Sequence, residues 1–331
     1  MSSLVLIAPD PEASISGGNL YNRGLARALA ARGVEVRVVA LDGARGALAA
    51  APAGAVVLLD SLYLDVLPAL RAAAVGQSVM LLAHWLPSLV RHGGVPPREA
   101  LSGDEQAALA EADAVVVPSA FMARAVAALG AERAHVVEPA VELPPVAGVP
   151  EEGALLRAIA VANVVPGKGL LGLVEALRPA LVAGAPLGLT IVGSLEPDRA
   201  YAEQCLARAA GVAAIRFAGA RSHAQALALV AGSDLFVSAS RMESYGMALA
   251  EARALGVPIV ARAGGNVAAH VDERAGGRLV ADEAEVAAEC LRLAGDRAEL
   301  ARRRAQARAG RPARSWDDAA AELAAALGIT R

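Results

Sequence analysis

The feature that most constrains the fold is a regular alternation, along the whole chain, of short apolar runs with helical segments rich in Ala and Leu. Such runs are typical of parallel strands buried on both faces, and the segments between them are typical of the helices that cover those faces. The pattern therefore predicts an α/β fold built from doubly wound parallel sheets. The predicted strands are 3–8, 35–41, 55–60, 78–83, 114–118, 134–137, 156–162, 187–192, 214–218, 234–238 and 258–261.

A proline-rich segment divides the alternation into two halves. Residues 138–150 hold four prolines in 13 positions, which neither a helix nor a sheet accommodates, so we interpret them as a linker. We predict a Rossmann-like domain over 1–143, a second over 144–312, and a C-terminal helical segment over 313–331 that packs back on the first domain. Two such domains are expected to face each other across a cleft lined by the carboxyl ends of their strands.

Composition excludes several classes of protein. The 31 basic and 34 acidic residues give a formal net charge of -3, so no basic field predicts binding to nucleic acid. The two cysteines, Cys205 and Cys290, form no CxxC motif, which disfavours a disulfide framework or a zinc site and favours a reducing compartment. The N-terminus lacks a basic signal-peptide region, and glycine and proline interrupt the uncharged stretch 179–195. We expect a cytoplasmic protein with no transmembrane segment.

The most informative motif lies between Glu243 and Glu251. A predicted strand ends before it, and a helix is predicted over 245–255, stopped by Gly256. The free amides at a helix start bind anions such as a diphosphate; those expected here belong to Ser244, Tyr245, Gly246 and Met247. Glu251 would lie roughly 7–8 Å along the helix from Gly246, about the offset between a diphosphate and its ribose hydroxyls. Glu243 would accept a hydrogen bond from a hydroxyl of the group that the distal phosphate carries. The alternative is a capping glutamate followed by a solvent-exposed one.

A second loop carries the only lysine of the chain, Lys168, which follows the predicted strand 156–162 and Asn163. All 30 other basic residues are arginine, so this exception indicates a site that requires a compact ammonium between oxyanions. A surface lysine without function is the alternative. The Gly-Lys-Gly sequence is not a Walker A loop, because the upstream glycine and the following Ser or Thr are missing.

Two further positions follow predicted strands of the first half. Gly17 and Gly18 lie in the first strand-to-helix connection, where glycine lets a phosphate or a sugar approach the backbone. His84 follows the strand 78–83, where it either contacts a reacting group or completes the edge of the core. No Asp-x-Asp pair or histidine spacing predicts a metal site, and no local Ser or Cys nucleophile is present.

Taken in order, these residues resemble the family-4 retaining glycosyltransferases of the GT-B fold. The resemblance covers nearly the whole chain, and the Glu243 to Glu251 spacing, with Gly246 inside it and Gly264-Gly265 after it, is specific in combination. Further matching segments are the glycine loop, the histidine after a central strand, Val117-Pro-Ser119, Asn163 to Lys168, Ile191-Val-Gly193 and Phe217-Ala-Gly219.

The resemblance implies a GT-B fold and the transfer of a hexose from a UDP- or GDP-sugar to an acceptor hydroxyl, with retention of anomeric configuration, no metal ion and no other cofactor. The acceptor is open among small molecules, glycans and lipids. The rival functions are a sugar-nucleotide epimerase of the same fold and a non-catalytic nucleotide-sugar binder.

The resemblance also implies roles for single residues. Lys168 would bind the diphosphate and Glu251 the ribose, while Glu243 and the amides of 244–247 would hold the sugar and the distal phosphate. Gly193 and Asn163 belong to the same donor-binding set, although the family usually has arginine where Asn163 stands. Gly17 and Gly18 would close on the phosphates from the other domain, and His84 would contact the donor sugar. The catalytic set is thus His84, Lys168 and Glu243.

Overall fold

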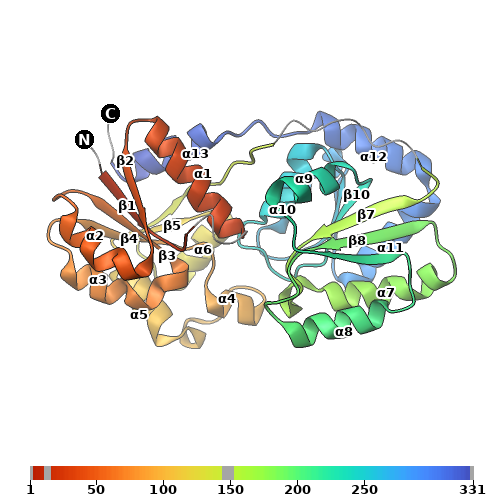
Figure 1. Cartoon of the computed structure of the whole chain (residues 1–331), viewed down its shortest axis with the longest axis horizontal. Helices are drawn as coiled ribbons and strands as arrows, with labels where there is room; N and C mark the ends of the chain where they lie inside the picture. Colours follow the sequence, from red (N-terminus) through yellow and green to blue (C-terminus); the bar gives the residue numbers. More distant parts are fainter. Residues whose placement is uncertain (1–2, 11–15, 144–152, 329–331) are drawn as a thin grey trace. The chain divides into compact units, whose positions relative to one another are not determined.

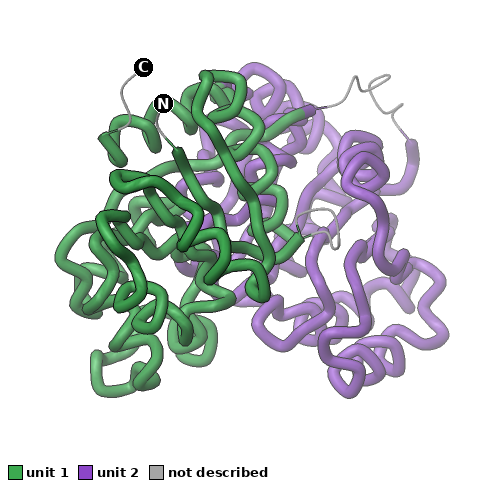
Figure 2. The backbone as a smooth tube through the Cα atoms, turned by 60° about the vertical axis from the view of Figure 1, so that its left-hand side comes forward, with its two compact units in different colours: residues 1–142, 314–331 green, residues 143–313 purple. Residues whose placement is uncertain are grey.

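The computed structural model describes residues 3–10, 16–143 and 153–328. The chain forms two compact units (Figure 2). Unit 1 comprises residues 1–142 and 314–331, and unit 2 comprises residues 143–313. Each unit contains one six-stranded parallel sheet with helices on both faces, which confirms the predicted α/β fold class.

The sheet of unit 1 has the strand order β2-β1-β3-β4-β5-β6. All its paired strands are parallel, and β1, β3 and β5 are buried over their whole length, as expected for a sheet covered on both faces. The strand order reverses between β1 and β3, where the loops that follow the two strands diverge. The strands are β1 (Ser3–Ile7), β2 (Glu35–Val39), β3 (Val56–Asp60), β4 (Ser78–Leu82), β5 (Val115–Val117) and β6 (Ala134–Val136).

The helices of unit 1 include one from the far end of the chain. They are α1 (Gly17–Ala31), α2 (Ala44–Ala50), α3 (Leu67–Ala73), α4 (Pro87–His92), α5 (Gly103–Glu111), α6 (Ala120–Ala128) and α13 (Trp316–Ala326). Helix α13 packs against α1 (Figure 1). Its Leu323 side chain is fully buried in the core of unit 1, and Trp316 covers Gly24, where any Cβ would overlap the indole ring.

The sheet of unit 2 has the order β12-β11-β10-β7-β8-β9 and is also parallel throughout. Here the order reverses between β7 and β10. The strands are β7 (Leu156–Val161), β8 (Leu187–Val192), β9 (Ile215–Gly219), β10 (Leu235–Ser238), β11 (Ile259–Arg262) and β12 (Arg278–Val280).

The helices of unit 2 form two layers, one on each face of its sheet (Figure 1). Helices α7 (Leu170–Val182), α8 (Arg199–Ala209) and α11 (Glu283–Gly295) share one apolar core with the sheet, and α9 (His223–Ala231) and α10 (Met247–Leu255) share the other. Helix α12 (Arg297–Ala309) follows α11.

Every predicted strand is present, with ends within two residues of the prediction, and β12 is an additional strand. Of the predicted linker, residues 138–143 are neither helix nor strand, and 144–150 lie outside the described residues. Within the part of the chain that the structure describes, no helix is long and apolar enough to cross a membrane.

Candidate functional site

The two most informative loops of the sequence follow neighbouring strands of unit 2. Strands β7 and β10 pair directly, and the strand order reverses between them. In open α/β sheets, ligands bind outside the carboxyl ends of the strands at such a reversal, because the loops on either side diverge there. The loops 162–169 and 239–246 are joined at this point by a hydrogen bond from the amide of Arg241 to the carbonyl of Gly167, with an N–O distance of 2.9 Å.

Lys168 and Glu243, predicted separately, lie together at this point. The distance between Lys168 Nζ and Glu243 Oε1 is 2.6 Å, and the two side chains are 28% and 18% exposed. Both are therefore accessible to a ligand although they are paired. The close approach of the loops requires Gly169, because a Cβ there would overlap the carbonyl oxygen of Ala239 and its φ is +65°.

The backbone of Glu243 is held by the glycine pair after β11. Glu243 forms a parallel bridge with Gly265, and the amide of Asn266 donates to the Glu243 carbonyl over 2.8 Å. A Cβ on Gly264 would overlap the carbonyl oxygen of Arg241, and a Cβ on Gly265 would overlap that of Glu243. These two glycines thus allow the chain after β11 to lie directly against the segment that presents Glu243.

The prediction that α10 begins at Tyr245 is wrong by two residues. The helix begins at Met247, because Gly246 adopts a φ of +98° and serves as its N-cap. Ser244 and Tyr245 consequently lie in the preceding loop, and the first-turn amides of the helix belong to Met247 and its successors rather than to the predicted set of 244–247.

Two residues that we had not predicted hold this loop. The carbonyl of Tyr245 accepts hydrogen bonds from Asn266 Nδ2 at 3.0 Å and from His270 Nε2 at 2.7 Å, and the His270 ring also contacts the Tyr245 ring edge-on. Burial lowers the pKa of His270, an effect that the Tyr245 hydrogen bond opposes and the nearby Arg253 reinforces. The ring is therefore neutral, with its proton on Nε2.

Glu251 is buried, so the predicted alternative of a solvent-exposed glutamate is wrong for this residue. It is 5% exposed, and its Oε1 lies 2.8 Å from Nε2 of His223, the first residue of α9. No sequence pattern connects these two residues, because the contact arises only from the packing of α9 on α10.

Asn163 and Gly193 join the loops after β7 and β8. Asn163 Oδ1 accepts a hydrogen bond from the amide of Ser194 over 3.1 Å, and a Cβ on Gly193 would overlap the carbonyl oxygen of Ala162. Asn163 thus fixes a neighbouring loop at the position where the resemblance led us to expect a cation.

The histidine predicted in unit 1 belongs to a buried polar cluster at the carboxyl ends of β3 and β4. Asn22 Nδ2 donates to Asp60 Oδ2 at 2.7 Å, so the other side of the Asn22 amide, Oδ1, faces His84 Nε2 at 2.8 Å. His84 Nε2 therefore carries the proton. Burial lowers the pKa of His84, and the Asp60 carboxylate opposes that effect. Gly18 lies against the ring, where a Cβ would be 3.2 Å from His84 Cδ2; Gly17 is the first residue of α1.

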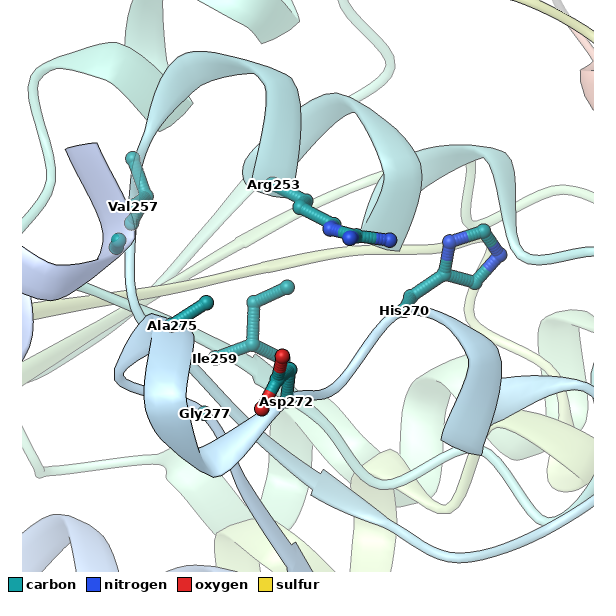
Figure 3. A pocket seen from close by; sticks show the side chains of 8 residues that line it. Arg253, Val257, Ile259, His270, Asp272, Ala275 and Gly277 are labelled. Carbon is teal, nitrogen blue, oxygen red and sulfur yellow. The ribbon is translucent and has the colours of Figure 1, made fainter. Parts of the chain in front are cut away.

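A small pocket lies in unit 2 beside His270, lined by residues of α10, β11, α12 and the 270–277 segment (Figure 3). Its volume of about 10 Å³ holds about one water molecule, so it is too small for a substrate. The Arg253 side chain extends from α10 toward His270 (Figure 3). Among residues 3–10, 16–143 and 153–328, no group of three or more His, Cys, Asp or Glu is arranged to hold a metal ion.

Comparison with known proteins relates this geometry to a family. Residues 156–296 match the family model described as "Glycosyl transferases group 1", a match that includes Lys168, Glu243 and Glu251. No curated protein sequence matches the chain.

Solved structures resemble the chain over its whole length. Sucrose-phosphate synthase from Thermosynechococcus elongatus has a TM-score of 0.77 and 20% identity, with 99% of this chain and 98% of that chain covered. HepE from Anabaena, solved in complex with UDP-glucose, has a TM-score of 0.75 and 16% identity, with both chains fully covered. Trehalose-6-phosphate synthase OtsA has a TM-score of 0.74 and 14% identity, again with both chains fully covered. The fold is therefore GT-B and, with the family match over unit 2, the protein is a glycosyltransferase.

Proposed function

We propose that the protein is a retaining, metal-independent glycosyltransferase of the family-4 type, which transfers a hexose from a UDP- or GDP-sugar to an acceptor hydroxyl. The observation that carries the proposal is the pair of Lys168 and Glu243, 2.6 Å apart at the strand-order reversal of unit 2 and next to the start of α10. The complex of the structurally similar HepE with UDP-glucose supports a nucleotide-sugar donor.

The leaving diphosphate is the group that this arrangement stabilises. As the bond between the anomeric carbon and the phosphate oxygen breaks, negative charge builds up on the diphosphate. The ammonium of Lys168 and the first-turn amides of α10, beginning at Met247, are fixed in place before the reaction and stabilise that charge. This supplies the electrostatic stabilisation that a divalent cation provides in other transferases.

Retention of configuration follows if the acceptor attacks from the face that the diphosphate leaves. The acceptor oxygen forms the new bond to the anomeric carbon, and the departing phosphate oxygen takes the acceptor's proton, so no nucleophile from the protein is needed. Glu243 accepts a hydrogen bond from a hydroxyl of the donor sugar, and Glu251 accepts hydrogen bonds from the ribose hydroxyls. Contacts of Gly17, Gly18 and His84 with the donor belong to the same proposal.

The test removes the paired charges one at a time. Lys168→Ala and Glu243→Ala should each lower turnover of the donor at least ~100-fold, the scale associated with loss of one group that stabilises an oxyanion. The matched control is Arg199→Ala, which removes an exposed ion pair with Glu196 on the surface of unit 2 and should leave turnover unchanged. Near-normal turnover in both site variants would refute the assigned roles.

Four further measurements separate the proposal from its rivals. Turnover should be unaffected by EDTA, and NMR of the product should show the donor's anomeric configuration; a strict divalent-cation requirement or inversion would contradict the mechanism. A new sugar isomer formed from the donor without any acceptor would indicate an epimerase. Tight binding of the donor without transfer to any acceptor would indicate a binding protein.

A further inference from the structure

The hydrogen bond between His223 and Glu251 brings a residue into unit 2's candidate site that the mechanism above does not use, His223. Glu251 lies in the second turn of α10 and is 5% exposed, which is unusual for a carboxylate in a helix. Among the described residues, the hydrogen bond to His223 Nε2 is the only one that its carboxylate makes, and it involves Oε1.

The position of His223 is itself fixed by the start of α9. Ser222 caps this helix: its Oγ accepts from the amide of Gln225, and the Gln225 side chain accepts from the amide of Ser222. Such a reciprocal cap fixes the first turn of a helix. His223 directly follows the cap, and its side chain is 25% exposed, so it lies between the buried carboxylate and solvent.

A glutamate side chain rotates about three bonds, and a hydrogen bond to one carboxylate oxygen restricts all of them. With Oε1 committed to His223, the second oxygen of Glu251 is held in one direction. A rigid buried carboxylate that is placed to accept a hydrogen bond from a ligand hydroxyl strongly disfavours a ligand analogue without that hydroxyl. When the analogue binds, the carboxylate loses its water but gains no new hydrogen-bond donor.

We propose that His223 is a positioning residue, which orients Glu251 toward the ribose of the donor and thereby makes the protein select ribonucleoside over 2′-deoxyribonucleoside diphosphate sugars. This inference rests on the proposed function, in which Glu251 accepts the ribose hydroxyls. His223 acts through Glu251 and does not contact the reacting atoms.

The experiment measures binding of the nucleotide alone, so it needs neither the acceptor nor the sugar. The full chain is titrated calorimetrically with UDP and GDP, and the tighter of the two is compared with its 2′-deoxy form. The wild type should bind the ribose form at least ~10-fold more tightly, the effect of a hydrogen bond to a charged group. His223→Ala should weaken binding of the ribose form by about 10-fold and that of the deoxy form, which keeps only the 3′-hydroxyl, by less, so that the preference for ribose falls.

Two variants separate positioning from a general effect on the fold. His223→Gln keeps an N–H group near the position of Nε2 and should restore most of the preference for ribose. Arg199→Ala, the control, removes an exposed side chain at the start of α8 that contacts neither α9 nor Glu251, and should leave the ratio of the two Kd values unchanged. The inference is overturned if His223→Ala weakens both nucleotides equally, or neither.

Failure of the inference can be told from failure of the proposed function. If neither UDP nor GDP binds the wild type, or if Glu251→Gln leaves the Kd of the ribose form unchanged, the assigned role of Glu251 is wrong and the inference falls with it. If Glu251→Gln weakens the ribose form selectively while His223→Ala has no effect, only the inference fails.

Discussion

At the scale of single residues, buried polar side chains held by one another organise both candidate clusters. His84 in unit 1 and His270 in unit 2 are each buried, each donate a hydrogen bond through Nε2, and each have a pKa lowered by burial. The pKa of such a histidine returns to its ordinary value when the protein unfolds, so the free energy of unfolding depends on pH.

The sign for His270 can be worked out directly. Its pKa in the folded protein lies below the ordinary 6.5. Between these two values the unfolded chain binds more protons, so the free energy of unfolding falls as the pH is lowered below about 6.5 and is unaffected above it. His270→Gln keeps an N–H group for the Tyr245 carbonyl but takes up no proton. The slope of the unfolding free energy of unit 2 against pH should therefore become shallower, by at most about 1.4 kcal/mol per pH unit.

Urea unfolding between about pH 5.5 and 7.5 checks this prediction, with unit 2 followed as the part of the circular dichroism change that does not coincide with the tryptophan fluorescence of unit 1. His92→Gln serves as the control, because His92 is exposed and lies in unit 1. An unchanged slope in His270→Gln would mean that His270 is protonated equally in the folded and unfolded states.

Some residues of the candidate site could be predicted from the sequence, whereas the residues that hold them could not. Lys168 and Glu243 could be predicted because each follows a predicted strand and stands out in composition or motif. His223, which bonds Glu251, and Asn266, which bonds the Glu243 carbonyl, could not, because each contact joins loops or helices whose relative positions depend on packing. Asp60 carried a usable signal, a charged residue at the carboxyl end of an apolar strand, which we did not interpret as part of a site.

At the scale of elements, the sequence pattern located all but one of the strands, and a glycine shifted the start of one helix. The apolar runs were sufficient to locate the strands, but β12 has only three residues and none of them is fully buried, so it lacks a buried-strand pattern. The helix pattern from Tyr245 onward was genuine, yet the positive φ of Gly246 delays the start of α10 and frees the preceding loop to present Glu243.

The glycine pair after β11 gives a prediction at this scale. Gly265→Ala would place a methyl group on the Glu243 carbonyl and would also require a non-glycine residue at a φ of +57°. The left-handed conformation alone costs about 1–2 kcal/mol, and the overlap forces the Glu243 segment to move. We expect a larger loss of stability than that and a fall in turnover of at least ~10-fold, because a displacement of about 1 Å in a positioned group is enough to cause it.

The matched control for this variant is Gly184→Ala. Gly184 also has a positive φ, of +88°, but a Cβ there would meet nothing within 4 Å. Gly184→Ala should lower the free energy of unfolding only by the cost of the left-handed conformation, and it should keep full turnover. Urea unfolding and donor turnover of the two variants test the claim, and equal turnover in both would show that the close approach at Gly265 does not position the site.

At the scale of the whole molecule, the chain leaves unit 1, forms unit 2 and then returns, so that α13 completes the core of unit 1 from the other end of the sequence. The return is fixed by the Trp316 ring over Gly24, by an ion pair of 2.6 Å between Arg32 and Asp317, and by Arg314, which bonds the carbonyl of Glu138 at 2.7 Å. These contacts lie within unit 1, so its stability should depend on α13 while that of unit 2 should not.

The two tryptophans, Trp85 and Trp316, both belong to unit 1, so tryptophan fluorescence reports the unfolding of that unit, while circular dichroism reports both. Leu323→Ala and Leu293→Ala each remove a fully buried leucine, one from α13 in unit 1 and one from α11 in unit 2, and each should cost about 2–5 kcal/mol. Leu323→Ala should shift the fluorescence transition to lower urea concentration. Leu293→Ala should leave that transition in place and shift only the part of the circular dichroism signal that fluorescence does not follow. If both variants instead shift both signals together, the two units unfold as one and α13 stabilises the whole chain.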